Sequence, residues 1–235
     1  MNSPLVIVPT YNERENIDRL LDTILSLPSR WHVLVIDDRS PDGTADAVST
    51  HAEYKNRVHL IQRPGKMGLG TAYCTGFRWA LERAYEWIAQ MDADFSHDPI
   101  DLEKLKGATE NTPIALGSRY IQGGGTIGWA KHREFISRCA NIYARIFTGV
   151  PAHDLTGGFK CFKRETLSKL EIDKVKSEGY AFQIEVTTQL YRKGCSVTEV
   201  PIIFKEREKG VSKFSKKIVF EAFFVVAKLG LQRIF

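Results

Sequence analysis

Short apolar, β-branched runs alternate with helical patterns through the first half of the chain, and this alternation restricts the folds open to it. The predicted strands cover residues 5–8, 33–36, 58–61, 87–91 and 114–116. Helices are predicted over 13–26, 44–53 and 70–85, the first opened by Asn12 and Glu15 in the spacing of a capping box. Continuously apolar strands are typical of a parallel sheet covered on both faces. We therefore predict an α/β doubly wound domain with right-handed crossovers.

The second half of the chain predicts helices over 132–147 and 181–193 and a last strand over 197–204. From Lys213 onwards the pattern is helical and apolar, with Lys213, Lys217, Glu221 and Lys228 on one narrow face. The opposite face carries Ile218, Ala222, Val225, Val226 and Leu229. Charged residues interrupt the segment, so it lacks the roughly 20 apolar residues that a spanning helix needs.

We therefore divide the chain into an α/β domain, residues 1–212, and an amphipathic helix, residues 213–235, that lies on a membrane without crossing it. The alternative is a C-terminal helix that packs on its own domain or on a partner subunit. No basic segment with an apolar core opens the chain, so we expect no secretory signal.

Charge and cysteine content exclude several classes of protein. Residues 205–235 contain eight Lys and Arg against three Glu, which equals the whole net charge of +5. The body is then nearly neutral, so a nucleic-acid-coating surface is not expected, and a phosphate site or an anionic membrane is the better partner. The four cysteines form no C-x-x-C pair, which argues against a zinc site and a disulfide framework and fits a reducing cytoplasm.

Asp92 and Asp94 follow the predicted strand 87–91 and are candidates for a metal site. Two carboxylates on one side of an extended chain repel each other unless a cation lies between them. Oxygen ligands at a strand end suit Mg²⁺ or Mn²⁺. The D-x-D pattern alone is common, and a solvated turn is the alternative. His97 lies next to the pair, and we interpret it as a turn histidine rather than a ligand.

The first two predicted strands also end in polar residues. Pro9 ends strand pairing, and Tyr11 and Glu13 then project into the crevice at the carboxyl edge of the sheet, where a nucleotide can bind. The alternative is ordinary helix capping with a half-buried tyrosine. Asp37 and Asp38 end the second strand, where an acid can hold ribose hydroxyls or form a structural turn.

The glycine-rich segments do not match the standard nucleotide motifs. No G-x-G-x-x-G follows the first strand, which disfavours a dinucleotide site, and no Walker sequence is present. The segment 65–70 is expected to pass under a nucleotide and begin a helix. The glycines at 123–125 are expected to form a flexible loop that closes over a ligand.

Basic residues lie at positions suited to phosphate. Ser118 and Arg119 end the fifth strand, and Arg133 follows the glycine loop, so both arginines can clamp a phosphate, although surface ion pairs are the alternative. Asp154 lies in a tight turn near the crevice. Arg207 and Lys213 belong to a basic loop that can neutralise a diphosphate.

Taken in this order, the motifs resemble the polyprenol-phosphate mannosyltransferases, including the dolichol-phosphate enzymes, which are inverting family-2 glycosyltransferases with the GT-A fold. The resemblance runs from Val6 to about Lys217. It implies that Pro9, Tyr11, Glu13, Asp37 and Asp38 line the nucleotide pocket and that Asp92 and Asp94 hold Mg²⁺ or Mn²⁺. It further implies that Ser118, Arg119 and Arg133 receive the lipid phosphate, with Asp94 and both arginines catalytic. Arg207 and Lys213 match the loop that closes on the nucleotide phosphates.

The chain departs from the family in two places. Some relatives have Gln as a third metal ligand where this chain has Ser96, so water can complete the metal shell here. Other relatives continue into transmembrane helices, whereas this chain ends at Phe235. It resembles the short form, expected on the cytoplasmic face of the membrane as a peripheral protein, with a membrane-anchored partner or a homo-oligomer left open.

The expected reaction is transfer of mannose from GDP-mannose to a polyprenyl phosphate with inversion. A phosphate monoester with a second pKa near 6 is already largely dianionic at neutral pH, so no general base is needed. The same fold with UDP-glucose or another donor or acceptor is the nearest alternative. A non-catalytic nucleotide-binding subunit and a soluble nucleotidyltransferase are the alternatives from other classes.

Overall fold

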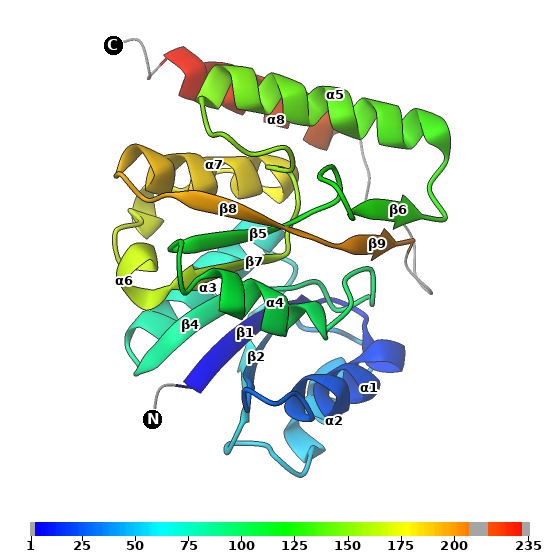
Figure 1. Cartoon of the computed structure of the whole chain (residues 1–235). Coiled ribbons are helices and arrows are strands. Elements are labelled where there is room, and N and C mark those ends of the chain that lie inside the picture. Colours follow the sequence, from blue (N-terminus) through cyan, green and yellow to red (C-terminus); the bar gives the residue numbers. More distant parts are fainter. Residues whose placement is uncertain (1–2, 207–215, 232–235) are drawn as a thin grey trace.

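The computed structural model describes residues 3–206 and 216–231, with only the backbone given for 216–222 (Figure 1). The expected nucleotide-loop residues Arg207 and Lys213 lie outside the described residues.

A seven-stranded sheet forms the centre of the molecule, in the order β3-β2-β1-β4-β7-β5-β8. Its strands are β1 (Ser3–Thr10), β2 (His32–Asp37), β3 (Val58–Gln62), β4 (Tyr85–Gln90), β5 (Ile114–Ser118), β7 (Lys160–Lys163) and β8 (Val197–Pro201). Every pairing is parallel except those of β7, which runs antiparallel to β4 and β5. The predicted mostly parallel α/β sheet is confirmed.

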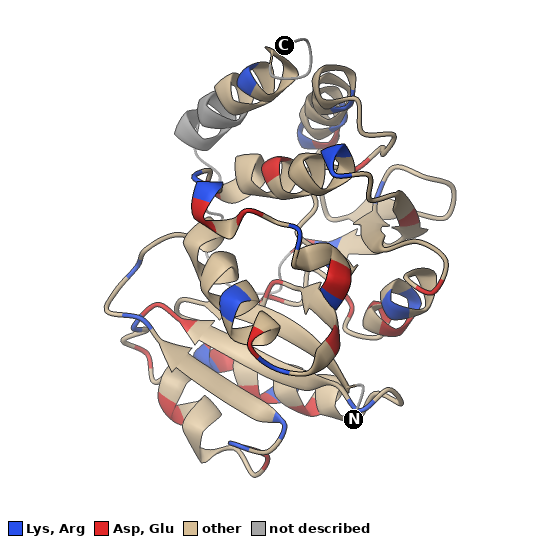
Figure 2. Cartoon of the chain, turned by 90° about the vertical axis from the view of Figure 1, so that its left-hand side faces the viewer, with Lys and Arg blue, Asp and Glu red and all other residues tan. Residues whose placement is uncertain are grey.

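Helices cover both faces of this sheet. They are α1 (Arg14–Leu25), α2 (Thr44–Thr50), α3 (Leu69–Leu81), α4 (Asp101–Ala108), α5 (Lys131–Thr148), α6 (Arg164–Leu167), α7 (Gly179–Arg192) and α8 (Lys216–Leu231), with a 3₁₀ turn at Ile172–Lys174. The side chains of β1 show the two faces, since Val6 and Val8 pack with α1, α2 and α4, and Leu5 and Ile7 pack with α3 and α7. Acidic and basic residues are intermixed over these layers (Figure 2).

The boundaries of several elements differ from expectation. The predicted helix 70–85 ends at Leu81, because β4 already begins at Tyr85. The predicted strand 197–204 is two strands, since β9 (Ile203–Lys205) leaves the main sheet and pairs with β6 (Gly125–Ile127). The capping-box prediction for α1 was wrong, because Glu13 is the residue before its first turn and makes no side-chain cap, and the Arg14 N–H donates instead to Asp42 at 3.0 Å.

Helix α8 packs on its own domain. It lies beside α5 and against α7 (Figure 1), and Val226 and Leu229 are buried in the core on the α3 and α7 side of the sheet. Val226 and Leu229, which we expected on a membrane, are therefore used for packing. Phe223 and Phe224 remain exposed instead, at 52% and 68%. Among the described residues, no helix combines the length and apolar character needed to cross a membrane.

Candidate active site

The carboxyl ends of β1, β2, β4 and β5 lie at one edge of the sheet because these strands run in the same direction. β1 ends at Thr10, β2 at Asp37, β4 at Gln90 and β5 at Ser118. The sequence-predicted residues Tyr11, Asp38, Asp92 and Arg119 follow these four ends within two residues. The structure therefore brings the predicted polar motifs to one edge, which is where ligands bind in open α/β sheets.

Asp92 and Asp94 occupy the loop after β4. Burial raises the pKa of the Tyr73 hydroxyl, and the charges of Asp92 and Asp94 raise it further, so both carboxylates lie close to that side chain. Asp94 is 5% exposed, and both the backbone N–H and the hydroxyl of Ser96 donate to its Oδ1, at 3.1 and 2.6 Å. Ser96 therefore orients Asp94.

This donor set fits a hard divalent cation. Two carboxylates share one corner of the sheet edge, and the neighbouring polar groups offer oxygen rather than sulfur. In the described residues no three His, Cys, Asp or Glu side chains are grouped so that they could hold a metal ion. Water or a substrate phosphate would therefore have to complete the shell of a cation at Asp92 and Asp94.

Asp37 and Asp38 hold the loops that border the site. Asp37 is fully buried and accepts bonds from the Thr10 hydroxyl at 2.9 Å and the Ser40 hydroxyl at 2.5 Å. Asp38 Oδ1 lies 2.5 Å from the Arg63 guanidinium, and its Oδ2 accepts the Met67 N–H at 3.0 Å. These two acids fix the loops at this edge of the sheet, including the glycine-rich segment 65–70.

The residues that follow β1 lie beside that segment. The Lys66 ammonium sits 4.5 Å from the centre of the half-buried Tyr11 ring. The Glu13 carboxylate accepts the Asn16 side-chain amide at 2.9 Å, and Pro9 is half-buried in the last part of β1. Tyr11 thus presents an aromatic face next to a cation at the predicted nucleotide side.

Arg119 and Asp154 form a buried, bidentate ion pair. Nε and Nη2 of Arg119 lie 2.7 Å from Oδ2 and Oδ1 of Asp154, and Nη2 also donates to the Thr156 hydroxyl at 3.0 Å. Burial alone would raise the pKa of Asp154, but the charge and hydrogen bonds of Arg119 lower it. Sequence reasoning placed both residues near the crevice and missed that they pair.

Arg119 and Arg133 meet at one indole ring. The guanidinium carbon of Arg133 lies 4.0 Å from the Trp129 ring centre and that of Arg119 lies 5.2 Å from it. Arg133 also forms a half-exposed ion pair with Glu206, at 3.0 Å. The two arginines that we predicted for phosphate binding are therefore brought together.

A cavity of about 540 Å³ begins at these arginines and is mostly apolar. Its lining comes from α5, α7, α8, the end of β5 and the loops before α5 and β7. It comprises Arg119, Trp129, His132, Arg133, Ile136, Ser137, Ala140, Tyr143, Thr156, Tyr180, Ile184, Phe223 and Val226. The cationic groups gather around Trp129, while Tyr143 and Phe223 stack with ring centres 4.8 Å apart. The cavity thus joins a cationic part to an apolar part.

Buried polar residues that the sequence did not single out hold this region together. Asn141 in α5 accepts the N–H groups of Leu155 and Thr156, at 2.7 and 3.1 Å. Lys160 in β7 is fully buried. Burial lowers the pKa of its ammonium to about 7, although the negative charge of Asp154 acts to raise it. No local sequence signal marks either residue, because each acts through contacts distant in sequence.

Two other predicted features behave differently from expectation. The glycine loop 123–125 packs against the backbone of Ser118 and Arg119, since a Cβ on Gly124 would lie 2.5 Å from the Ser118 carbonyl oxygen.

His97 is 2% exposed and stacks on Phe159 with ring centres 4.8 Å apart, and burial lowers its pKa to about 4. His97 is therefore a buried, neutral histidine. We predicted a turn residue and did not expect its ring to be packed in the interior.

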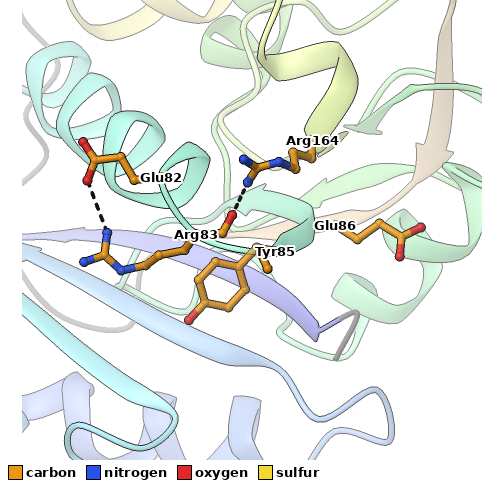
Figure 3. A pocket seen from close by; sticks show the side chains of 6 residues that line it. Glu82, Arg83, Tyr85, Glu86 and Arg164 are labelled. Carbon is orange, nitrogen blue, oxygen red and sulfur yellow. Dashed lines mark hydrogen bonds and ion pairs between the residues drawn. The ribbon is translucent and has the colours of Figure 1, made fainter.

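A second cavity, of about 490 Å³, lies at the opposite edge of the sheet where β4 begins. Glu82, Arg83, Ala84, Tyr85, Glu86 and Arg164 line it (Figure 3). Arg164 donates to the carbonyl oxygens of Ala80, Leu81 and Arg83 at the end of α3. This is helix capping by a cation, and the cavity lies apart from the predicted chemistry.

Known proteins resemble this chain over nearly its whole length. The model of glycosyl transferase family 2 matches residues 5–171. The polyprenol monophosphomannose synthase of Mycolicibacterium smegmatis is 44% identical over 230 residues, covering 97% of this chain and 87% of that protein. The undecaprenyl-phosphate mannosyltransferase of Micrococcus luteus is 42% identical over 227 residues, covering 97% and 93%.

Two solved structures show the same GT-A architecture. Glucosyl-3-phosphoglycerate synthase from Mycobacterium tuberculosis, in complex with Mn²⁺, uridine diphosphate and glucosyl-3-phosphoglycerate, superposes with a TM-score of 0.67 at 17% identity, covering 99% of this chain and 80% of that one. A mannosyltransferase from Pyrobaculum calidifontis in complex with GDP-Man and Mn²⁺ superposes with a TM-score of 0.59 at 19% identity, covering 97% of this chain and 72% of that one. The sequence match and the sheet edge with its paired acids agree, and the chain belongs to glycosyl transferase family 2.

Proposed function

We propose that this protein transfers mannose from GDP-mannose to a polyprenyl phosphate, with inversion at the anomeric carbon. The observation that carries the proposal is the cavity in which Arg119 and Arg133 adjoin an apolar lining. A lipid phosphate needs both parts, because its head group is anionic and its chain is hydrocarbon. The relatives from M. smegmatis and M. luteus are named for mannosyl transfer to such lipids, which supports the same acceptor class here.

The two arginines suit the acceptor phosphate. Arg119 is held rigid by Asp154 and lies against Trp129, so its guanidinium keeps a fixed orientation in the lining of the cavity. Arg133 is more exposed and its partner Glu206 is at the surface, so it can exchange that ion pair for a phosphate. Ser118 ends β5 directly before Arg119, and its hydroxyl accepts the Tyr120 N–H at 3.4 Å.

The reaction is a single displacement. An oxygen of the lipid phosphate forms a bond to the anomeric carbon of mannose, and the bond from that carbon to the GDP oxygen breaks. Asp92 and Asp94 would hold Mg²⁺ or Mn²⁺, which stabilises the negative charge on the leaving diphosphate when bound. Tyr11, Glu13 and Pro9 line the nucleotide side in this proposal, and Asp37 and Asp38 fix its loops. Arg207 and Lys213 would add positive charge at the diphosphate.

We also propose that the protein binds the membrane surface through α5 and α8. These neighbouring helices expose Phe135 at 68%, Ile146 at 65% and Phe224 at 68%. Exposed apolar groups beside basic residues such as Arg138 and Arg145 are typical of a surface that lies in the interface of an anionic bilayer. The cavity lies between the same two helices, so a lipid could enter it from the bilayer.

A donor competition tests the proposal. Purified protein receives a short polyprenyl phosphate, Mn²⁺ and either GDP-mannose or UDP-glucose, and the organic-extractable product is quantified. We expect product from GDP-mannose. NMR of this product should show that the anomeric configuration of the sugar is inverted relative to the donor. Product from UDP-glucose alone would assign the enzyme to the alternative donor, and retained configuration would exclude the single displacement.

A further inference from the structure

Gln183, in the first turns of α7, has a buried side-chain amide without a hydrogen-bond partner among the described residues. It is 2% exposed, yet neither its amide nitrogen nor its amide oxygen has a hydrogen-bond partner among the described residues. Burying an unpaired amide costs stability, so such a group in a folded protein calls for a partner. No described residue supplies that partner, so a bound molecule is a candidate for it.

The position of Gln183 indicates where that molecule lies. A Cβ built on Gly158 would be 3.4 Å from the Gln183 amide nitrogen and 3.8 and 3.9 Å from the two oxygens of Asp92. The amide and the carboxylate therefore border one small space, and glycine at 158 leaves it open. Asp92 belongs to the proposed donor site, so the space adjoins the diphosphate side of that site.

The backbone of Gln183 is fixed beside this space. The buried Lys160 ammonium donates to the Gln183 carbonyl oxygen at 2.7 Å and to the Thr187 hydroxyl at 2.9 Å. These bonds join α7 to β7 in the interior of the domain. The amide is thus held on a rigid element, as expected for a residue that recognises a ligand.

We propose that the Gln183 amide hydrogen-bonds to hydroxyl groups of the hexose that is transferred, and so contributes to the choice of sugar. This inference rests on the proposed function. An amide is both a donor and an acceptor, which matches hydroxyls on neighbouring sugar carbons. A cation would use only the amide oxygen and leave the buried NH₂ unpaired, so a sugar satisfies the whole group better than the metal does.

The first test replaces Gln183 by methionine, which has similar size and no amide. We expect kcat/KM for GDP-mannose to fall about tenfold to hundredfold, because a hydrogen bond in the site is lost. The inhibition constant of GDP with Mn²⁺ should stay within about twofold, since GDP carries no sugar. The unliganded protein should melt no lower than wild type, because an unpaired buried amide is removed. The control is Gln189→Met in the same helix, where the amide pairs with Glu185 at 3.3 Å.

The second test fills the space itself through Gly158→Ala. The added methyl group meets only ordinary contacts of 3.4 Å or more, so the fold should be retained. We expect the same selective loss of GDP-mannose turnover with GDP binding kept.

Three results would overturn the inference. Unchanged kcat/KM in both variants would show that the sugar does not use this space. An equal loss of GDP affinity would assign Gln183 to the metal or nucleotide. If wild-type protein neither binds nor turns over GDP-mannose, the proposed function fails and this inference fails with it. If wild-type protein is active and both variants are as active as wild type, only this inference fails.

Discussion

Arg119 and Asp154 are joined by two side-chain hydrogen bonds of 2.7 Å in a part of the protein where their side chains are only 5% and 0% exposed. A third bond, from the Arg119 backbone N–H to Asp154 at 3.0 Å, fixes the end of β5 to the same carboxylate. The guanidinium that borders the cavity is therefore held in one orientation before any ligand binds. Such preorganisation favours binding of a phosphate without a further ordering cost.

Asp154→Asn should destabilise the fold strongly. The change leaves the Arg119 charge buried without its counter-ion, and breaking a buried pair costs about 3–5 kcal/mol in the free energy of unfolding. Urea denaturation measures this value. The matched control is Asp173→Asn, which breaks the exposed pair with Arg78 and should cost no more than about 1 kcal/mol. Equal effects of both changes would show that the buried pair has no special role.

Ala140→Trp should block the acceptor while sparing the donor. Ala140 lines the cavity and is exposed on α5, so the larger ring can enter the space without disturbing the core. We expect the KM for polyprenyl phosphate to rise about tenfold or more, as loss of a few buried CH₂ contacts implies, and the KM for GDP-mannose to stay constant. Cys139→Trp is the control, since Cys139 is the preceding exposed residue and does not line the cavity. Equal KM values in the two variants would argue against a lipid in this cavity.

The double variant Phe135→Asp with Ile146→Asp should release the protein from anionic vesicles. Each exposed side chain contributes roughly 1.5–3 kcal/mol when buried in an apolar phase, so the partition coefficient should fall at least about tenfold. Co-sedimentation with liposomes measures it. Ile100→Asp serves as control, because Ile100 is 58% exposed and lies at the start of α4. Sedimentation that both variants leave unchanged would rule out α5 as a membrane surface.

Stability should fall as the pH drops below about 6.5. His32 and His59 at the amino-terminal edge of the sheet bracket the Tyr85 hydroxyl at 3.2 and 3.3 Å. Burial lowers the pKa of both from the ordinary value of 6.5, and the charges of nearby Arg57 and Arg83 act in the same direction on His32 and His59 respectively. The unfolded chain then binds more protons than the folded one, so their contribution is complete above pH 6.5 and is lost below it.

The measurement is urea denaturation at pH 7.5 and at pH 5.5. We expect His59→Gln to show a smaller difference between the two pH values than wild type, because it removes one of these titrating groups and its repulsion with His32. The same pH difference in both proteins would contradict this assignment.

The fold was largely predictable because its strands are apolar, short and separated by helices with clear periodicity. β7 was not predicted because its apolar run is only Cys161 and Phe162, between Lys160 and Lys163. No pattern in the neighbouring sequence predicts that Lys160 is buried in a central strand. The end of β8 was also missed, because Ile202 continues the apolar run although the chain turns there to pair with β6.

The site was predictable as a set of residues and not as a set of contacts. Asp92, Arg119 and Arg133 come from motifs whose place at strand ends and loops is visible in the sequence. The pairing of Arg119 with Asp154, 35 positions away, depends on how β5 and the loop before β7 meet in space. The unpaired amide of Gln183 likewise becomes visible only when its surroundings are known.

The central claim is metal-dependent mannosyl transfer to a lipid phosphate, and one assay tests it most directly. Labelled GDP-mannose, a short polyprenyl phosphate and the purified protein are incubated with Mn²⁺, with chelator, and with Mn²⁺ restored, beside the variants Asp94→Ala and Asp98→Ala. We expect label in the organic phase with wild type and Asp98→Ala. Chelation should abolish it and added metal restore it, and folded Asp94→Ala should give about 100-fold less. Undiminished transfer by Asp94→Ala or in the presence of chelator, or no lipid-linked mannose at all, would contradict it.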